Sequence, residues 1–146
     1  MAFNNILVPI DGSATAYSAV DKAVELAKAF NSKITVVQVL TLDPYIAAEY
    51  ISASQTNELI ERARKFILAS LEEAKAKFAE SGVTVETKLL EGQVIHREIT
   101  QAAEDIHADI IIMGSHGRTG LKKLFLGSVA QSVLSEGTTP VMIIRD

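Results

Sequence analysis

The chain has 146 residues, a length that suits one domain over residues 1–146. It contains no cysteine, which excludes disulfides, thiolate nucleophiles and cysteine-ligated metal sites and fits a reducing compartment. Its formal net charge of −4 argues against a nucleic-acid-binding surface, because phosphate backbones bind basic faces. The sequence predicts neither a signal peptide nor a membrane span, since no apolar run approaches the roughly 20 residues that a spanning helix needs. We therefore expect a cytoplasmic protein.

The N-terminal half alternates between short apolar runs and amphipathic stretches. Runs rich in Ile and Val with little alternation are typical of strands that are buried on both faces. The elements expected here are a strand over Ile6–Ile10, a helix capped by Ser13, a strand over Ile34–Leu40, a loop over Leu42–Gln55, and a long helix from about Thr56 that ends at Ser81-Gly82.

The C-terminal half continues the same alternation. Apolar and polar residues alternate over Thr84–Leu90, which predicts a strand with one exposed face at an edge of the sheet. The elements expected after it are a helix opened by Gly92, a strand over Ile110–Met113, a short helix capped by Ser128 and closed by Gly137, and a last strand over Val141–Ile144.

Strands that alternate with helices predict an open, twisted parallel sheet of the α/β class with helices on both faces. In such sheets, ligands bind beyond the carboxyl ends of the strands, where the strand order reverses. The first strand ends at Pro9-Ile-Asp11 and the fourth at Met113-Gly114, and both carry residues suited to a ligand. They form one site only if these strands are neighbours, which predicts the order 3-2-1-4-5.

The segment from Gly114 to Ser128 is rich in glycine and leads from a buried strand into a helix. Glycine lets main-chain amides approach a bulky anion, and the start of a helix adds unsatisfied donors and a positive dipole end. The segment therefore predicts a cradle for the phosphates of a nucleotide. Ordinary surface turns remain the alternative. Arg118, Lys122 and Lys123 add positive charge to the same loop, either as a solvated face or as anion contacts.

Other residues limit the chemistry of the site. Asp11 would repel a phosphate and suits ribose hydroxyls or a bridging magnesium, or else it caps the first helix. Neither a Walker A sequence nor Gly-x-Gly-x-x-Gly follows the first strand, which disfavours NAD. His96 and His107 would lie on one helix about 16 Å apart, too far to share a metal ion, and we expect both at the surface. No serine triad or carboxylate pair is evident, so binding is favoured over turnover.

Four segments of the chain together resemble the universal stress proteins of the ATP-binding subgroup. The resemblance covers the whole chain, and its core is the fixed spacing of glycines after the fourth strand. The segments are Gly114-x2-Gly117-x9-Gly127-Ser128, Ile6-Leu-Val-Pro-Ile-Asp11-Gly-Ser, Ala108-Asp-Ile-Ile-Ile-Met-Gly-Ser-His-Gly117 and Thr139-Pro-Val-Met-Ile-Ile144.

The resemblance implies a Rossmann-like sheet of the adenine nucleotide alpha hydrolase type, with ATP at the switch point. Pro9 and Asp11 would lie at the adenosine, and the main chain of Val39 would hold the adenine. Mg²⁺ or Mn²⁺ would bind mainly through the phosphates and water. The first wall of the phosphate pocket would be Met113, Gly114, Ser115, His116, Gly117, Arg118 and Thr119, and the second wall Gly127, Ser128 and Val129.

The resemblance also implies a homodimer formed through the last strand. Val141, Met142, Ile143 and Ile144 form an apolar strand without a protective charge before Arg145, and such an edge tends to pair. The function expected is that of an ATP-binding module which regulates protein partners during stress. Two alternatives stay open: a slow ATPase or nucleotide-using transferase, and a chaperone-like protein whose nucleotide is incidental.

Overall fold

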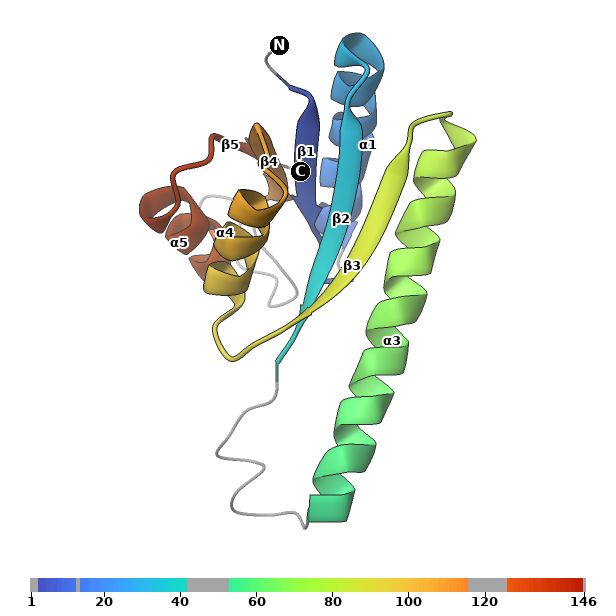
Figure 1. The fold of residues 1–146 in the computed structure, drawn as a ribbon, viewed down its shortest axis with the longest axis vertical. Helices are drawn as coiled ribbons and strands as arrows, with labels where there is room; N and C mark the ends of the chain where they lie inside the picture. The colour runs from blue at the N-terminus through green and yellow to red at the C-terminus, as the bar shows by residue number, and fades with distance from the viewer. Residues whose placement is uncertain (1–2, 13, 42–52, 116–125, 146) are drawn as a thin grey trace.

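The structure, a computed structural model, describes residues 3–12, 14–41, 53–115 and 126–145 (Figure 1). The strands and helices expected from the sequence are all found in these residues. In chain order they are β1 (Asn5–Pro9), α1 (Ala14–Phe30), β2 (Lys33–Leu40), α3 (Ala53–Glu80), β3 (Val85–Glu91), α4 (Ile95–Asp105), β4 (Ile110–Gly114), α5 (Ser128–Glu136) and β5 (Val141–Ile144).

All five strands are parallel and lie in the order β3-β2-β1-β4-β5, which confirms the predicted order. β1 occupies the centre, where Leu7 lies beside Thr35 of β2 and Ile111 of β4. The carboxyl ends of β1 and β4 therefore meet at one edge of the sheet. This is the point at which the strand order reverses, and it is where ligands bind in folds of this kind.

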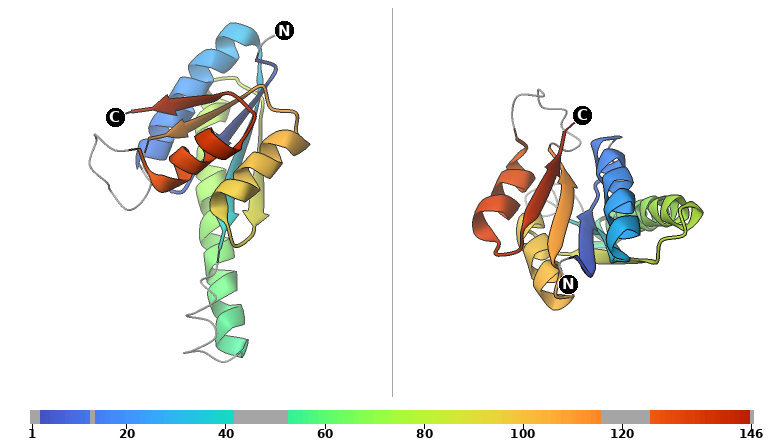
Figure 2. Two further views of the ribbon diagram at one scale, coloured as in Figure 1. Left: turned by 90° about the vertical axis from the view of Figure 1, so that its left-hand side faces the viewer. Right: turned by 90° about the horizontal axis from the view of Figure 1, so that it is seen from above.

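Helices cover both faces of the sheet, as the view from above in Figure 2 shows: α1 and α3 lie on one side, α4 and α5 on the other. Successive side chains of a strand point to opposite faces, so each central strand supplies both cores. Ile6 and Val8 are fully buried on the α1 and α3 side, whereas Leu7 is fully buried on the α4 and α5 side. This two-sided burial explains the nearly continuous apolar runs of the central strands.

The two edge strands of the sheet, β3 and β5, differ in their burial pattern. The sequence predicted the pattern of β3. β3 alternates between half-buried and exposed residues, which confirms the expected edge strand with one solvated face. β5 forms the other edge, and all four of its residues are half-buried. Within the described part of the chain, no helix combines the length and the apolarity that crossing a membrane requires.

Several predicted helix boundaries were wrong. α3 begins at Ala53, so the expected loop over Leu42–Gln55 is helical at its end, and residues 42–52 lie outside the described residues. α4 begins after Val94 and not at Gly92. The residue that caps α5 is Gly127, and Ser128 is the first helical residue. The first residue of a helix depends on how the helix packs in the fold. A nearby polar residue in the sequence does not determine it. Ser13, the predicted cap of α1, lies outside the described residues.

Candidate functional site

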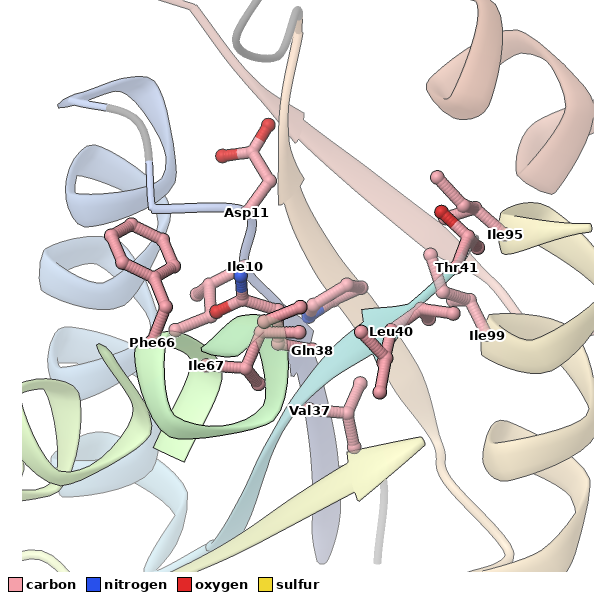
Figure 3. Close-up of a pocket in the computed structure, with 13 residues that line it drawn as sticks. Ile10, Asp11, Val37, Gln38, Leu40, Thr41, Phe66, Ile67, Ile95 and Ile99 are labelled. Carbon is pink, nitrogen blue, oxygen red and sulfur yellow. The ribbon is translucent and has the colours of Figure 1, made fainter. Parts of the chain in front are cut away.

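A hollow of about 240 Å³ opens beyond the carboxyl ends of β1 and β2, between α3 and α4 (Figure 3). Figure 3 shows Asp11 and Phe66 on one side of it and Ile95 on the other. Its volume is below the roughly 300–1,000 Å³ of pockets that enclose a drug-sized ligand, so it suits one ring system of a larger ligand. The lining residues are Pro9, Ile10, Asp11, Val37, Gln38, Val39, Leu40, Thr41, Ala63, Phe66, Ile67, Ile95 and Ile99.

The first lining residues, Pro9, Ile10 and Asp11, lie at the end of β1. The Ile10 amide donates a hydrogen bond of 2.8 Å to the carbonyl of Val37, so the pairing with β2 extends one residue beyond Pro9. Asp11 follows at the rim. Gly12 then turns the chain into α1 with a φ of +83°, a left-handed conformation that residues with a Cβ rarely adopt. The turn at Gly12 is therefore what leaves Asp11 at the mouth of the hollow.

β2 is longer than β1, and this difference exposes main-chain groups. The Val37 carbonyl points towards β1, where it accepts the Ile10 amide, whereas the Leu40 carbonyl points towards β3, where it accepts the Gly92 amide at 3.2 Å. Along a strand, the amide and carbonyl of alternate residues point to the same side. The amide and carbonyl of Val39 therefore point to the β1 side, past the end of β1, and their predicted contact with adenine stays a prediction.

Two helices supply apolar walls that the sequence analysis did not assign. Ala63, Phe66 and Ile67 lie three and four residues apart and so share one face of α3, and Ile95 and Ile99 share one face of α4. The periodic pattern showed that these faces are apolar. It did not show that they would border a hollow, because that depends on how α3 and α4 are placed across the ends of two strands.

Gln38 is a polar side chain inside the apolar strand β2, and it was also missed. It is 5% exposed, and its Oε1 has no hydrogen-bond partner among the described residues. A buried polar atom without a partner is costly and commonly marks a place that a ligand or water completes. The signal for it was present in the sequence as the one amide in the run Ile34–Leu40.

The second group of predicted residues lies at the end of β4 and the start of α5. Met113 and Ser115 are buried, Gly114 and Val129 are half-buried, and Ser128 is exposed. The Gly127 amide donates to the Ser115 carbonyl at 2.7 Å, and the Ser115 amide donates to the Ile144 carbonyl at 2.9 Å. The structure therefore joins the two predicted walls. His116, Gly117, Arg118 and Thr119 lie outside the described residues.

These contacts also restrict which amides face a ligand. The Ser115 and Gly127 amides donate within the protein, so neither is available as an anion donor. The first turn of a helix leaves its amides without main-chain partners. In α5 these are the amides of Ser128, Val129 and Ala130, because the next amide, that of Gln131, bonds to the Gly127 carbonyl at 2.9 Å. The Ser115 and Gly127 amides therefore leave the anion to the amides in the first turn of α5.

The two groups lie at one edge of the sheet. Leu7 pairs with Ile111, and continuing this register places Ile10 beside Gly114. Asp11, the next residue, lines the hollow, and its contact with a ribose stays a prediction. Among the described residues, no group of three or more His, Asp or Glu side chains is arranged to hold a metal ion.

Neither His96 nor His107, the two histidines that the structure describes, lines the hollow, and the prediction that they share a helix was wrong. α4 ends at Asp105, and His107 lies beyond it with a φ of +55°, so the two histidines do not share a helix. His96 is not fully at the surface: its Nε2 lies 2.5 Å from Oε2 of Glu136, at the end of α5. This contact connects the two helices of one face.

Comparisons with known proteins agree with this architecture. The family model described as the universal stress protein family matches residues 2–145. This chain belongs to the universal stress protein family. Universal stress protein YxiE of Bacillus subtilis is 36% identical over 148 residues, which cover 98% of this chain and 99% of that protein.

Solved structures of family members superpose along nearly the whole chain. The structure of protein MJ0577 has a TM-score of 0.80 and 30% sequence identity, and the match covers 100% of this chain and 98% of that one. A universal stress protein in complex with cAMP has a TM-score of 0.72 and 25% identity, and the match covers 99% and 98% of the two chains. A nucleotide is therefore bound by at least one structural neighbour.

Proposed function

We propose that this chain binds an adenine nucleotide, with ATP as the preferred ligand, and acts as a nucleotide-dependent regulatory module in the cytoplasmic response to stress. The base would enter the hollow between α3 and α4. The ribose would lie at Asp11, and the phosphates at the first turn of α5. The cAMP complex of a structural neighbour supports this class of ligand.

The observation that carries the proposal is the main-chain edge of Val39 between two apolar walls. A purine presents flat apolar faces and a polar rim. Ile95 and Ile99 on one side and Phe66 on the other would cover the faces, and the Val39 amide and carbonyl would meet the rim. Main-chain groups that extend past a neighbouring strand offer one donor and one acceptor in fixed positions.

Magnesium or manganese would accompany the triphosphate. Asp11 is the only carboxylate among the lining residues that the structure describes, so the ion would be held mainly by phosphate oxygens and water, the ligands that Mg²⁺ commonly keeps. When bound, the metal would neutralise phosphate charge. In this arrangement Asp11 serves the ribose and does not repel the phosphates.

Regulation fits the described site better than turnover does. General acid–base catalysis needs a titratable group placed at each reacting proton. The lining residues that the structure describes include one carboxylate and no histidine, and His116 lies outside the described residues. Bound nucleotide would instead change the surface at the start of α5 and the adjoining β5, which a protein partner and a second copy of the chain would recognise.

A homodimer through β5 forms part of the proposal. The Pro140 and Ile144 carbonyls point towards β4, where they accept the Ile111 and Ser115 amides at 2.8 and 2.9 Å. By alternation, the main-chain groups of Val141 and Ile143 point away from β4. An outer edge with free pairing groups and no charge is ready to pair with the same strand of a second copy.

The experiment that tests the function is calorimetric titration of ATP into the wild-type protein, Asp11→Asn and Asp21→Asn. Asp21 is an exposed residue of α1, so its variant makes the same chemical change away from the hollow. We expect Asp11→Asn to weaken ATP binding by roughly tenfold, as the loss of a charge-assisted hydrogen bond implies, and Asp21→Asn to bind like wild type. Absence of ATP binding by the wild-type protein would refute the proposal.

A further inference from the structure

Gln131, in the second turn of α5, makes hydrogen bonds to the two residues that precede this helix. Its side-chain Nε2 donates a hydrogen bond of 2.6 Å to the carbonyl of Leu126. Its main-chain amide donates to the carbonyl of Gly127 at 2.9 Å. One residue thus binds two consecutive carbonyls from within the helix.

The peptide between Leu126 and Gly127 is restrained from the other side as well. The Gly127 amide donates to Ser115 at the end of β4. Gly127, at the cap position of α5, has no side chain with which to cap the helix, and its backbone is extended, with φ −64° and ψ 156°. Because glycine has the greatest conformational freedom of all residues, its backbone would have to be ordered by other groups. Among the described residues, Ser115 and Gln131 make hydrogen bonds to this peptide.

We propose that Gln131 is a positioning residue for the phosphates of the nucleotide. It acts through the Leu126–Gly127 peptide, which leads directly into the first-turn amides of Ser128 and Val129. Binding costs less conformational entropy when the donor amides are already ordered in the free protein than when they must become ordered on binding. Gln131 lies outside the hollow, so its contribution concerns the phosphates and leaves the base unaffected. The inference rests on the proposed function.

The test uses the full chain with the substitution Gln131→Met, which keeps the length and helix propensity of the side chain and removes its donor. Gln101→Met is the matched control, because Gln101 is an exposed helical glutamine whose Nε2 donates to Asp105 Oδ1 at 2.9 Å in α4. The affinities of wild type and both variants for ATP and for adenosine are measured by calorimetry.

We expect Gln131→Met to weaken ATP binding roughly fivefold, the effect of about one net hydrogen bond, and to leave adenosine binding unchanged. Gln101→Met should change neither affinity. An equal loss for ATP and adenosine, or unchanged ATP binding, would overturn the role of Gln131 while the proposed function stands. If wild type binds neither ligand, both the proposed function and this role are refuted.

Hydrogen exchange provides a second measurement that needs no ligand. In the ligand-free protein, the amide of Gly127, which donates to the Ser115 carbonyl, should exchange faster in Gln131→Met than in wild type, because its peptide has lost a restraint. The same amide should keep its wild-type rate in Gln101→Met. Equal rates in Gln131→Met and wild type would show that Gln131 does not order this turn.

Discussion

The ammonium nitrogen of Lys77 in α3 lies 4.4 Å from the centroid of the Tyr17 ring in α1. The Tyr17 hydroxyl also donates a hydrogen bond to Glu73 of α3. Burial of the hydroxyl, with the bond to Glu73 and the charge of its carboxylate, raises the pKa of Tyr17 above its ordinary value of 10.0. Tyr17 thus connects the two helices that cover one face of the sheet.

The raised pKa of Tyr17 predicts a stability difference at alkaline pH. The folded state binds the phenolic proton more tightly than the unfolded state, so this contribution is complete below the unfolded pKa of about 10 and is lost as pH rises through the higher folded pKa. We expect the free energy of unfolding of wild type to fall more steeply above about pH 10 than that of Tyr17→Phe, which has no phenolic proton. Urea unfolding at several pH values measures this. Parallel pH profiles for the two proteins would contradict the linkage.

Gly12 and Gly82 offer a matched pair of backbone substitutions. Both have a positive φ, +83° and +75°, and a Cβ at either position meets nothing closer than 3.8 Å. Ala at each should destabilise the fold by about 1–2 kcal/mol through left-handed strain alone. Only Gly12→Ala should also weaken ATP binding, because Gly12 directs Asp11 to the hollow. Chemical denaturation and calorimetry separate the two effects. Equal affinities in the two variants would show that the turn at Gly12 does not position Asp11.

Phe78 and Phe66 lie in the same helix with opposite exposure. Phe78 is fully buried between α3 and the sheet, whereas Phe66 is 54% exposed and lines the hollow. Phe78→Ala should lose about 3–5 kcal/mol of unfolding free energy, as large core truncations do. Phe66→Ala should lose less than about 1 kcal/mol but bind ATP more weakly, since it removes one apolar wall. If Phe66→Ala and Asp11→Asn both bind ATP as tightly as wild type, the nucleotide lies outside the hollow.

The outward-facing amide of Ile143 tests the proposed dimer. Ile143→Pro removes this amide and leaves the hydrogen bonds between β5 and β4 in place, because those use the alternate residues. Ile143→Ala removes the side chain but keeps the amide, and it serves as the control. We expect sedimentation to show a weaker dimer for the Pro variant than for the Ala variant. Dimers of equal strength in both variants would exclude pairing through this edge.

The sequence predicted the strands well because burial on both faces leaves a direct mark on composition. The apolar run of Ile34–Leu40 follows from its place next to the centre of the sheet, and the alternation around Thr87 follows from the edge position of β3. The strand order was also accessible, since two ligand-binding signals at the ends of β1 and β4 are compatible only with neighbouring strands. Pro9, Asp11 and Val39, which the family resemblance assigned to the adenosine, line the hollow, and their contact with a nucleotide stays a prediction.

The first residues of the helices and the walls of the site were harder to predict from the sequence. A serine before an apolar stretch is a good cap by itself, yet α5 is capped by Gly127, because the bond from the Gly127 amide to Ser115 sets where the helix can begin. Similarly, the pattern of Phe66 and Ile95 shows only that each belongs to an apolar helix face. That these faces meet across a hollow depends on the relative placement of α3 and α4.

What the sequence determined by itself is therefore the parallel sheet and its order, because these follow from local periodicity and the direction of the chain, and with them the sheet edge where we propose that a ligand binds. The tertiary structure decided which amides at the end of β4 and the start of α5 already donate within the protein, that Gln38 has a buried oxygen without a partner among the described residues, and that Gln131 bonds to the start of α5. These features depend on contacts between segments far apart along the chain or on side-chain geometry, and hydrogen bonds form only when the final packing brings donor and acceptor within about 3 Å.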